Sequence, residues 1–366
     1  MRTTSVPPSA RPAKIAASSL YSRRVLPALM AVTFLLLLVP RPLAQSASQL
    51  DQLTRDGQAA LAREDYSTAA RDFEQAFRLN PQDPALARSL LLSDLQSGNL
   101  AAAISTGHDA TAKWPGDAEL HHLFGLAYFK NGQPADAAPE LQRAMQLRPA
   151  RYDLHFDYAL ALLAQDHYAP AADQLEQAIK IDPTQPLAHV LLGRAYQNSN
   201  RTDQAIEQFR TALRLDPHLP LGHYHLAYAL GSLGRNNEAI PEYEKEIANG
   251  PENPEVLYQY GHCLLETGRW KDAIAPLRRA TELAPTNGDA FYDLGKALLL
   301  QGDAPAAIAP LRQAIALKPT DPSPHYQLAR ALDRTASPDA KAEWQRFADL
   351  KKMQKPTGGM ASGRNQ

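Results

Sequence analysis

Apolar residues recur along this chain at the three- and four-residue spacing of amphipathic helices, in segments of one constant length. In one segment, Leu120, Leu123, Phe124 and Ala127 fall on a single helical face. A proline closes each segment, because proline lacks a backbone N–H and disfavours helical geometry in the residue before it. These prolines are evenly spaced: Pro81, Pro115, Pro149, Pro183, Pro217, Pro251, Pro285 and Pro319. The pattern predicts helix pairs that begin near residues 50, 84, 118, 152, 186, 220, 254 and 288.

Small residues keep the same register as the prolines. The second half of each segment carries one alanine series without exception: Ala69, Ala103, Ala137, Ala171, Ala205, Ala239, Ala273 and Ala307. A second series is broken only by Glu246: Ala76, Ala110, Ala144, Ala178, Ala212, Ala280 and Ala314. The first half carries its own small position: Gly57, Gly125, Ala159, Gly193, Ala227, Gly261 and Gly295. We expect the paired helices to approach closely at these residues.

The two helices of each pair are separated by a residue that tolerates a positive φ angle. These residues are Gly98, Gly132, Asp166, Asn200, Gly234, Gly268 and Gly302. A chain reversal is therefore predicted at each of them.

The glycine, alanine and proline spacing, with a period of about 34 residues, resembles that of the tetratricopeptide repeat family. The resemblance covers residues 50–321 as eight repeats, followed by a degenerate ninth unit at 322–355. It implies an all-α fold, a right-handed α-solenoid of about eight helix–turn–helix units in which each repeat packs on its neighbours. The ninth unit would end in a capping helix, with Ser337 as N-cap, Pro338 at the first helical position, and Trp344 and Phe347 covering the open end.

Some positions depart from the repeat pattern. Repeat two has Leu91 at the small position, Asp94 on an apolar face and Gly107 where a large apolar residue belongs, so we expect it to be the loosest-packed unit. Four prolines fall inside second helices, which they should bend: Pro139, Pro241, Pro276 and Pro310. Residues 356–366 are expected to be disordered.

The N-terminal region has the order of a secretory signal peptide: Arg23 and Arg24, a mostly apolar run from Val25 to Val39, then small residues. The run is shorter than the roughly 20 residues of a spanning helix. We expect a signal peptide at 1–44, a short linker at 45–49, and a body exported to the periplasm or cell envelope. Alternatively, the signal stays uncleaved and residues 25–39 anchor the body in the inner membrane, outside the cytoplasm.

Composition and charge argue against some classes of function and site. Residues 1–44 contain six of the 38 basic residues and no acidic one, which leaves 32 basic against 39 acidic residues, or −7, for the body. That acidic balance argues against nucleic-acid binding. Cys263 is the only cysteine and occupies a position where other repeats have alanine, so we expect a buried residue, no disulfide and no cysteine-based zinc site.

The candidate chemistry is sparse. Five histidines share one repeat position and are expected to serve the repeat rather than a catalytic or metal centre: His121, His155, His189, His223 and His325. There is no phosphate-binding glycine loop and no serine-nucleophile elbow. Since the repeats occupy the whole body, we expect no enzyme activity and no cofactor.

The resemblance implies that first helices line a concave face that binds a protein or peptide. The residues matching its exposed positions are His122, Phe129, Phe156, Arg194, Tyr224, Tyr228, Tyr258, Tyr292, Lys296, Tyr326 and Arg330. Four of these tyrosines recur at one repeat position, and either bind the partner or only pack between adjacent first helices.

Two classes of function stay open at this point. The chain is an exported adaptor for an extended peptide or protein, or a dedicated non-catalytic subunit or chaperone of one envelope enzyme complex.

Overall fold

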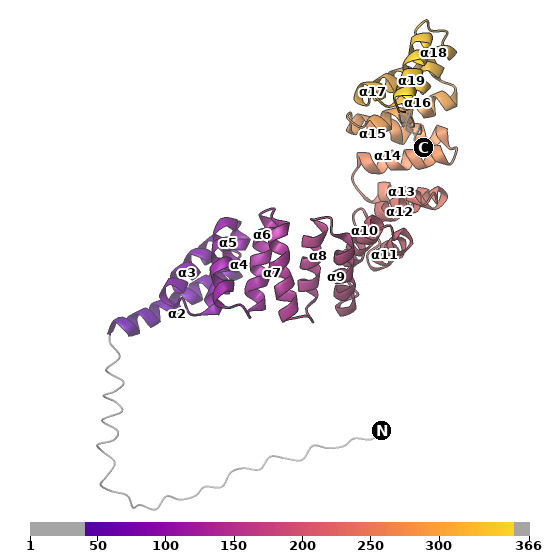
Figure 1. Ribbon diagram of the computed structural model, residues 1–366. Helices are drawn as coiled ribbons and strands as arrows, with labels where there is room; N and C mark the ends of the chain where they lie inside the picture. Colours follow the sequence, from indigo (N-terminus) through magenta and orange to yellow (C-terminus); the bar gives the residue numbers. More distant parts are fainter. Residues whose placement is uncertain (1–40, 355–366) are drawn as a thin grey trace, which may run out of the picture. The chain divides into compact units, whose positions relative to one another are not determined.

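The computed structural model describes residues 41–354, and every regular element in that range is an α-helix. The helices form successive antiparallel pairs, which confirms the predicted all-α solenoid (Figure 1). The chain divides into two compact units, Met1–Ser93 and Asp94–Gln366, and the boundary falls inside one helix. The repeat pattern does not predict this division, because the spacing of the prolines and alanines continues through it.

The described part of the N-terminal unit, residues 41–93, contains α2 (Arg41–Ala62), α3 (Tyr66–Leu79) and the start of α4 (Pro84–Ser97), which continues past the boundary. Phe73 is fully buried and forms a core with five other apolar residues: Ala60, Ala69, Ala76, Leu86 and Leu90. Residues 45–49, expected to be a linker, lie instead within α2, which begins at Arg41 rather than near 50.

The described part of the C-terminal unit contains the other helices, in which second and first helices of the repeats alternate from α5 onward. They are α5 (Leu100–Lys113), α6 (Ala118–Lys130), α7 (Pro134–Leu147), α8 (Tyr152–Leu163), α9 (Tyr168–Ile181), α10 (Pro186–Asn198), α11 (Thr202–Leu215), α12 (Gly222–Ser232), α13 (Asn236–Asn249), α14 (Pro254–Glu266), α15 (Trp270–Leu283), α16 (Gly288–Gln301), α17 (Ala304–Leu317), α18 (Pro322–Arg334) and α19 (Ala340–Gln354). The predicted starts at 84, 118, 152, 186, 254 and 288 are confirmed.

The chain reverses between paired helices at one repeat position. The seven predicted residues all have a positive φ, and so do Glu64 and Ala336, which occupy the same position in the first and last repeats. At these two positions a residue with a Cβ takes a conformation that glycine adopts more easily. The turn is therefore a property of the repeat, and does not depend on glycine in each copy.

Close helix contact follows from the small position on each first helix. A Cβ atom added to Gly125 would lie 2.6 Å from Leu141 Cγ, and one added to Gly261 would lie 2.5 Å from Leu277 Cγ. In both pairs the large residue follows 16 positions later, on the second helix. All eight residues of the unbroken alanine series are fully buried. Small residues thus bring the helices together, as the sequence predicts.

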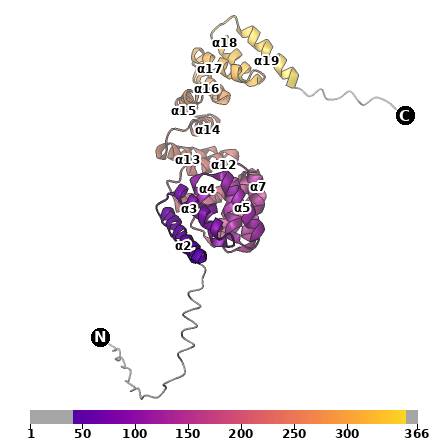
Figure 2. The same cartoon turned by 90° about the vertical axis from the view of Figure 1, so that its left-hand side faces the viewer.

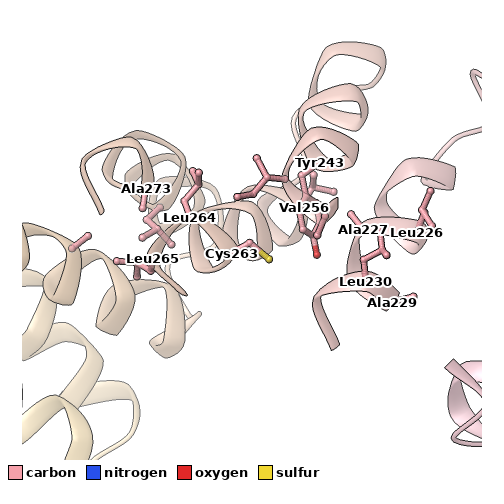
Figure 3. Close-up of a cluster of buried hydrophobic side chains, with 14 of the residues drawn as sticks. Leu226, Ala227, Ala229, Leu230, Tyr243, Val256, Cys263, Leu264, Leu265 and Ala273 are labelled. Atoms are coloured by element: carbon pink, nitrogen blue, oxygen red, sulfur yellow. The ribbon is translucent and has the colours of Figure 1, made fainter. Parts of the chain in front are cut away.

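The largest apolar cluster lies in the C-terminal unit. Figure 3 shows Tyr243 of α13 between side chains of α12, such as Leu230, and those of α14, such as Val256. Tyr243 is 1% exposed, and Cys263 of α14 is buried in the same cluster, as expected.

Repeat two has no hole at Gly107. A Cβ at this residue would lie 2.4 Å from the ring of Phe124, so the first helix of the next repeat fills the space that the missing side chain leaves. Asp94 is buried and accepts a hydrogen bond from Asn99 Nδ2 (3.3 Å). The space beside Gly107 is therefore filled, and the expectation that repeat two is the loosest-packed unit stays a prediction.

The recurring histidines tie three parts of a repeat together. His155 Nδ1 lies 2.9 Å from Gln174 Oε1 on the second helix, and Nε2 donates to the carbonyl of Pro149 (2.9 Å) in the preceding turn. His121, His189 and His223 repeat both contacts, with Glu140, Gln208 and Glu242 as second-helix partners. His325 contacts Glu343 of α19. The interpretation that these residues serve the repeat is confirmed.

The four prolines expected inside second helices lie inside α7, α13, α15 and α17. Each of these helices is 14 residues long and extends beyond its proline. Proline therefore removes one backbone hydrogen bond without ending the helix.

Glu246 has a structural role that the repeat pattern does not predict. An Asp or Asn side chain caps the first turn of α6, α14, α16 and α18. The equivalent residue before α12 is Leu219, whose side chain has no hydrogen-bond acceptor. Helix α12 accordingly begins at Gly222, two residues later than predicted, after Leu221 in a left-handed conformation (φ 60°). The buried Glu246 carboxylate accepts from the N–H of Leu221 (2.9 Å) and of Tyr224 (3.2 Å). It caps α12 from the neighbouring helix.

Helix α19 packs against α18 as the last described pair (Figure 2). Trp344 and Phe347 lie against Tyr326, with ring centroids 5.5 and 5.3 Å away. The helix begins at Ala340 rather than Pro338, and the Ser337 hydroxyl accepts from Asp339 N (3.4 Å).

Three expectations concern residues outside the described range. The signal peptide at 1–44 lies there except for its last four residues, as do the final residue of the unit 322–355 and the tail 356–366. Within residues 41–354, no helix is both long and apolar enough to cross a membrane.

Replacing Glu246 by the alanine of the other repeats should destabilise the protein. Glu246→Ala leaves the N–H of Leu221, just before α12, and the N–H of Tyr224, in its first turn, without their acceptor, at a cost of about 1 kcal/mol. Glu246→Gln, which keeps one acceptor oxygen, should lose less. The measurement is the free energy of unfolding in urea. A gain in stability on returning to alanine would contradict the capping role.

Deletion of residues 338–366 should expose the apolar face of α18. We expect fraying, self-association and a Tm lower by about 5 °C or more. Deletion of 356–366 alone is the control. Equal Tm, helicity and solubility for both truncated chains would show that α19 is not a cap.

Candidate partner-binding surface

First helices of neighbouring repeats contact one another in the C-terminal unit. This holds for α10 with α12, α12 with α14, α14 with α16, and α16 with α18. Equivalent residues of successive repeats therefore lie on adjacent first helices. Within one helix, residues four positions apart lie on the same face.

The tyrosine row consists of Tyr224, Tyr258, Tyr292 and Tyr326, which lie on α12, α14, α16 and α18 respectively. The first three are half-buried and pack against the main core, whereas Tyr326 is 38% exposed. Burial raises the pKa of Tyr224 to about 12. It also raises the pKa of Tyr258 and Tyr292. The tyrosines thus pack between helices, and their exposed edges form part of the surface.

A second row follows one helical turn later. It contains Arg194, Tyr228, His262, Lys296 and Arg330, again one per first helix, and we call it the polar row. Arg194 is exposed and Tyr228 is 41% exposed. Sequence reasoning missed His262, although its position one repeat after Tyr228 and one repeat before Lys296 could have identified it.

Two residues of the polar row bridge adjacent first helices. His262 Nδ1 on α14 lies 2.8 Å from Asp293 Oδ2 on α16. The hydrogen bond to this buried carboxylate raises the pKa of His262, which therefore carries positive charge at a higher pH than a free imidazole. Lys296 on α16 lies 3.4 Å from Glu266 on α14. Both contacts also fix the relative positions of these helices.

His225 does not add charge to the surface. Burial is the main cause that lowers its pKa to about 4, with a smaller effect from Arg194. Its ring stacks on Phe209, with the centroids 5.5 Å apart. It is a neutral packing residue at physiological pH.

An open pocket of about 360 Å³ lies where α16, α18 and α19 meet. Its walls include the rings of Tyr292, Tyr326 and Phe347 and the polar side chains of Gln327 and Lys351. Arg330 lies 5.7 Å from the centre of the Tyr326 ring. The pocket combines apolar walls with the cationic side chain of Lys351, which suits a side chain of a protein partner.

The candidate residues of earlier repeats are buried or half-buried. His122 is 6% exposed and its Nε2 lies 2.7 Å from Asp157 Oδ2, so the expectation that it faces a partner is wrong. Asp157 stands on the next first helix, and this contact draws the imidazole between the helices. Phe129 and Phe156 are half-buried, and Phe156 stacks on Tyr152 (5.4 Å). The three exposed candidates are Arg194 on α10, Tyr228 on α12 and Tyr326 on α18.

Two observations on the described residues concern metal binding and thiol chemistry. Among residues 41–354, no three His, Cys, Asp or Glu residues come close enough to hold a metal ion. Burial raises the pKa of Cys263 to about 11, so the thiol stays protonated at neutral pH.

Comparison with known proteins supports the repeat interpretation. A family model described as tetratricopeptide repeat matches residues 54–118, 122–186, 190–254, 224–288 and 261–322, which together span more than half of the chain. No curated protein matches the sequence.

Several solved structures are similar. YrrB, a tetratricopeptide repeat protein with an unusual peptide-binding site, is 20% identical over 50% of this chain and 95% of its own, with a TM-score of 0.47. PilF of Pseudomonas aeruginosa is 20% identical over 57% of this chain and 94% of its own (TM-score 0.48). A tetratricopeptide repeat protein from Parabacteroides merdae is 14% identical over 69% and 99% (TM-score 0.49). The family match, together with the periodic turns and helix contacts, shows that this chain belongs to the tetratricopeptide repeat family.

Proposed function

We propose that the chain is a non-catalytic, exported adaptor that binds an extended segment of a protein partner across the first helices α10 to α18. The observation that carries this proposal is the pairing of the tyrosine row with the polar row on successive first helices. Repeats occupy the described chain from α2 to α19, so binding is the function that this architecture supports best.

The tyrosine row suits recognition of a flexible segment. Three of its rings are already held by packing against the core, so binding immobilises few protein side chains. A ring edge with a hydroxyl offers both apolar contact and hydrogen bonding, and it tolerates varied partner sequences. The pocket beside Tyr326 would accept one anchoring side chain of the partner.

Export is supported by the two arginines and the apolar run from Val25 to Val39. The adaptor would then work in the periplasm or cell envelope. If the signal is not cleaved, residues 25–39 would hold it at the inner membrane with the same orientation.

Loss of two exposed first-helix side chains should weaken partner capture without unfolding the protein. The double change Arg194→Ala with Tyr228→Ala removes accessible groups of the polar row, and we expect capture to fall about ten-fold. The measurement is crosslinking in cells, identification of the partner, and titration of that partner with the purified variants. Tm should change by less than about 3 °C.

Trp270→Ala is the matched control, because Trp270 is an aromatic residue with 36% exposure on the second helix α15. Unchanged capture by the double variant, or an equal loss in the Trp270 variant, would show that the partner binds elsewhere.

Export depends on the apolar run in this proposal. Deletion of residues 25–39 should leave the chain in the cytoplasm, whereas the full chain should be recovered from the periplasmic or membrane fraction. Cell fractionation with N-terminal sequencing measures both location and cleavage. Recovery of the full chain from the cytoplasm alone would refute the exported role.

A further inference from the structure

We infer that the bound segment carries a carboxylate side chain at about every third residue, each one paired with a cation of the polar row. This inference rests on the proposed function and adds the chemistry of the partner. It follows from three features of the surface. These are the charge of the polar row, the position of its basic residues one turn after a tyrosine, and the spacing of the first helices.

Four of the five residues in the polar row are basic, although the chain carries one more acidic than basic residue overall. Only Tyr228 interrupts the series. The equivalent residues on α6 and α8 are Leu126 and Leu160, so the basic character begins at α10. The recurrence of basic residues at one position of successive first helices favours an anionic partner.

The cations at the two ends of the row are available to a partner. Arg194 is exposed, and no carboxylate of the described residues lies within ion-pair distance of it. Arg330 has only neutral partners among the described contacts, Gln327 Oε1 (3.1 Å) and the Tyr326 ring. The two central cations have acidic neighbours: Lys296 lies 3.4 Å from Glu266, and His262 lies 2.8 Å from Asp293. The Lys296 side chain keeps 28% of its surface exposed beside Glu266, and a partner carboxylate would approach it from that side.

Each basic residue on α14, α16 and α18 lies one turn after a tyrosine. The rings of Tyr258 and His262 are 6.1 Å apart, and Arg330 lies 5.7 Å from the centre of the Tyr326 ring. Each of these repeats therefore presents an apolar edge beside a positive charge. A partner that alternates apolar and acidic side chains satisfies both.

The spacing of the helices sets the period of the partner. Contacting helices lie about 8–10 Å apart, and an extended chain advances about 3.3 Å per residue. A segment that crosses the first helices thus meets a new tyrosine–cation pair after about three residues. This predicts carboxylates at positions i, i+3 and i+6 of the partner segment.

Three capped synthetic peptides test the inference on the purified chain. The first has four Leu-Thr-Glu triplets, the second replaces each Glu by Gln, and the third has the composition of the first with its four Glu residues contiguous. We expect the first peptide to bind about ten-fold more tightly than either of the others. This preference should decrease as salt is added.

Lys296→Gln with Arg330→Gln should abolish the preference for the first peptide. Arg312→Gln with Arg346→Gln is the matched control, since these arginines line a different pocket between α17, α18 and α19 and the net change in charge is the same. Fluorescence anisotropy titrations give each dissociation constant, and circular dichroism confirms that the variants are folded.

Equal binding of the Glu and Gln peptides, or an equal effect of the control pair, would overturn the acidic preference. Equal binding of the contiguous peptide would overturn the period of three. If a partner captured through Arg194 and Tyr228 proves to lack acidic residues, this inference fails while the proposed function stands. If Arg194 and Tyr228 are not needed for capture, the proposed function fails first.

Discussion

A glycine or alanine on most first helices faces a large apolar residue 16 positions later on the second helix, and this contact determines the distance between the paired helices. Gly261 and Leu277 illustrate it, since even one methyl group on the glycine would fall 2.5 Å from the leucine. The fully buried alanine series adds further close contacts. Because the contact recurs from repeat to repeat without insertion, each repeat presents its surface residues in the same register. The rows of tyrosines and cations exist only because that register is kept.

The repeat tolerates local exceptions where another group supplies the missing interaction. Phe124 fills the space beside Gly107, and Glu246 replaces the cap that Leu219 cannot provide. The histidines connect each preceding turn to both helices in four repeats. These interactions keep the 34-residue register of the helices, so an exception in one repeat does not shift the surface residues of the next.

Much of the fold could be predicted from the sequence, because proline, glycine and alanine act through local backbone geometry and size. Six helix starts and all seven predicted turn residues are confirmed. The start of α12 could not be predicted in this way, since it depends on a carboxylate 25 residues away from Leu221. The burial of His122 likewise depends on Asp157 in the next repeat. The repeat spacing could have identified His262. It was missed because the other residues of the polar row are of different types, so no single residue type recurs at this position.

The central claim is that a partner lies across the first helices of the C-terminal unit. Photocrosslinking in cells tests it directly, with a photoreactive phenylalanine placed at Tyr228 on the first helix α12 or, for comparison, at Trp270 on the second helix α15. The account predicts a discrete crosslinked product from position 228 and none from position 270. The same product from both positions, or a product from position 270 alone, would contradict it.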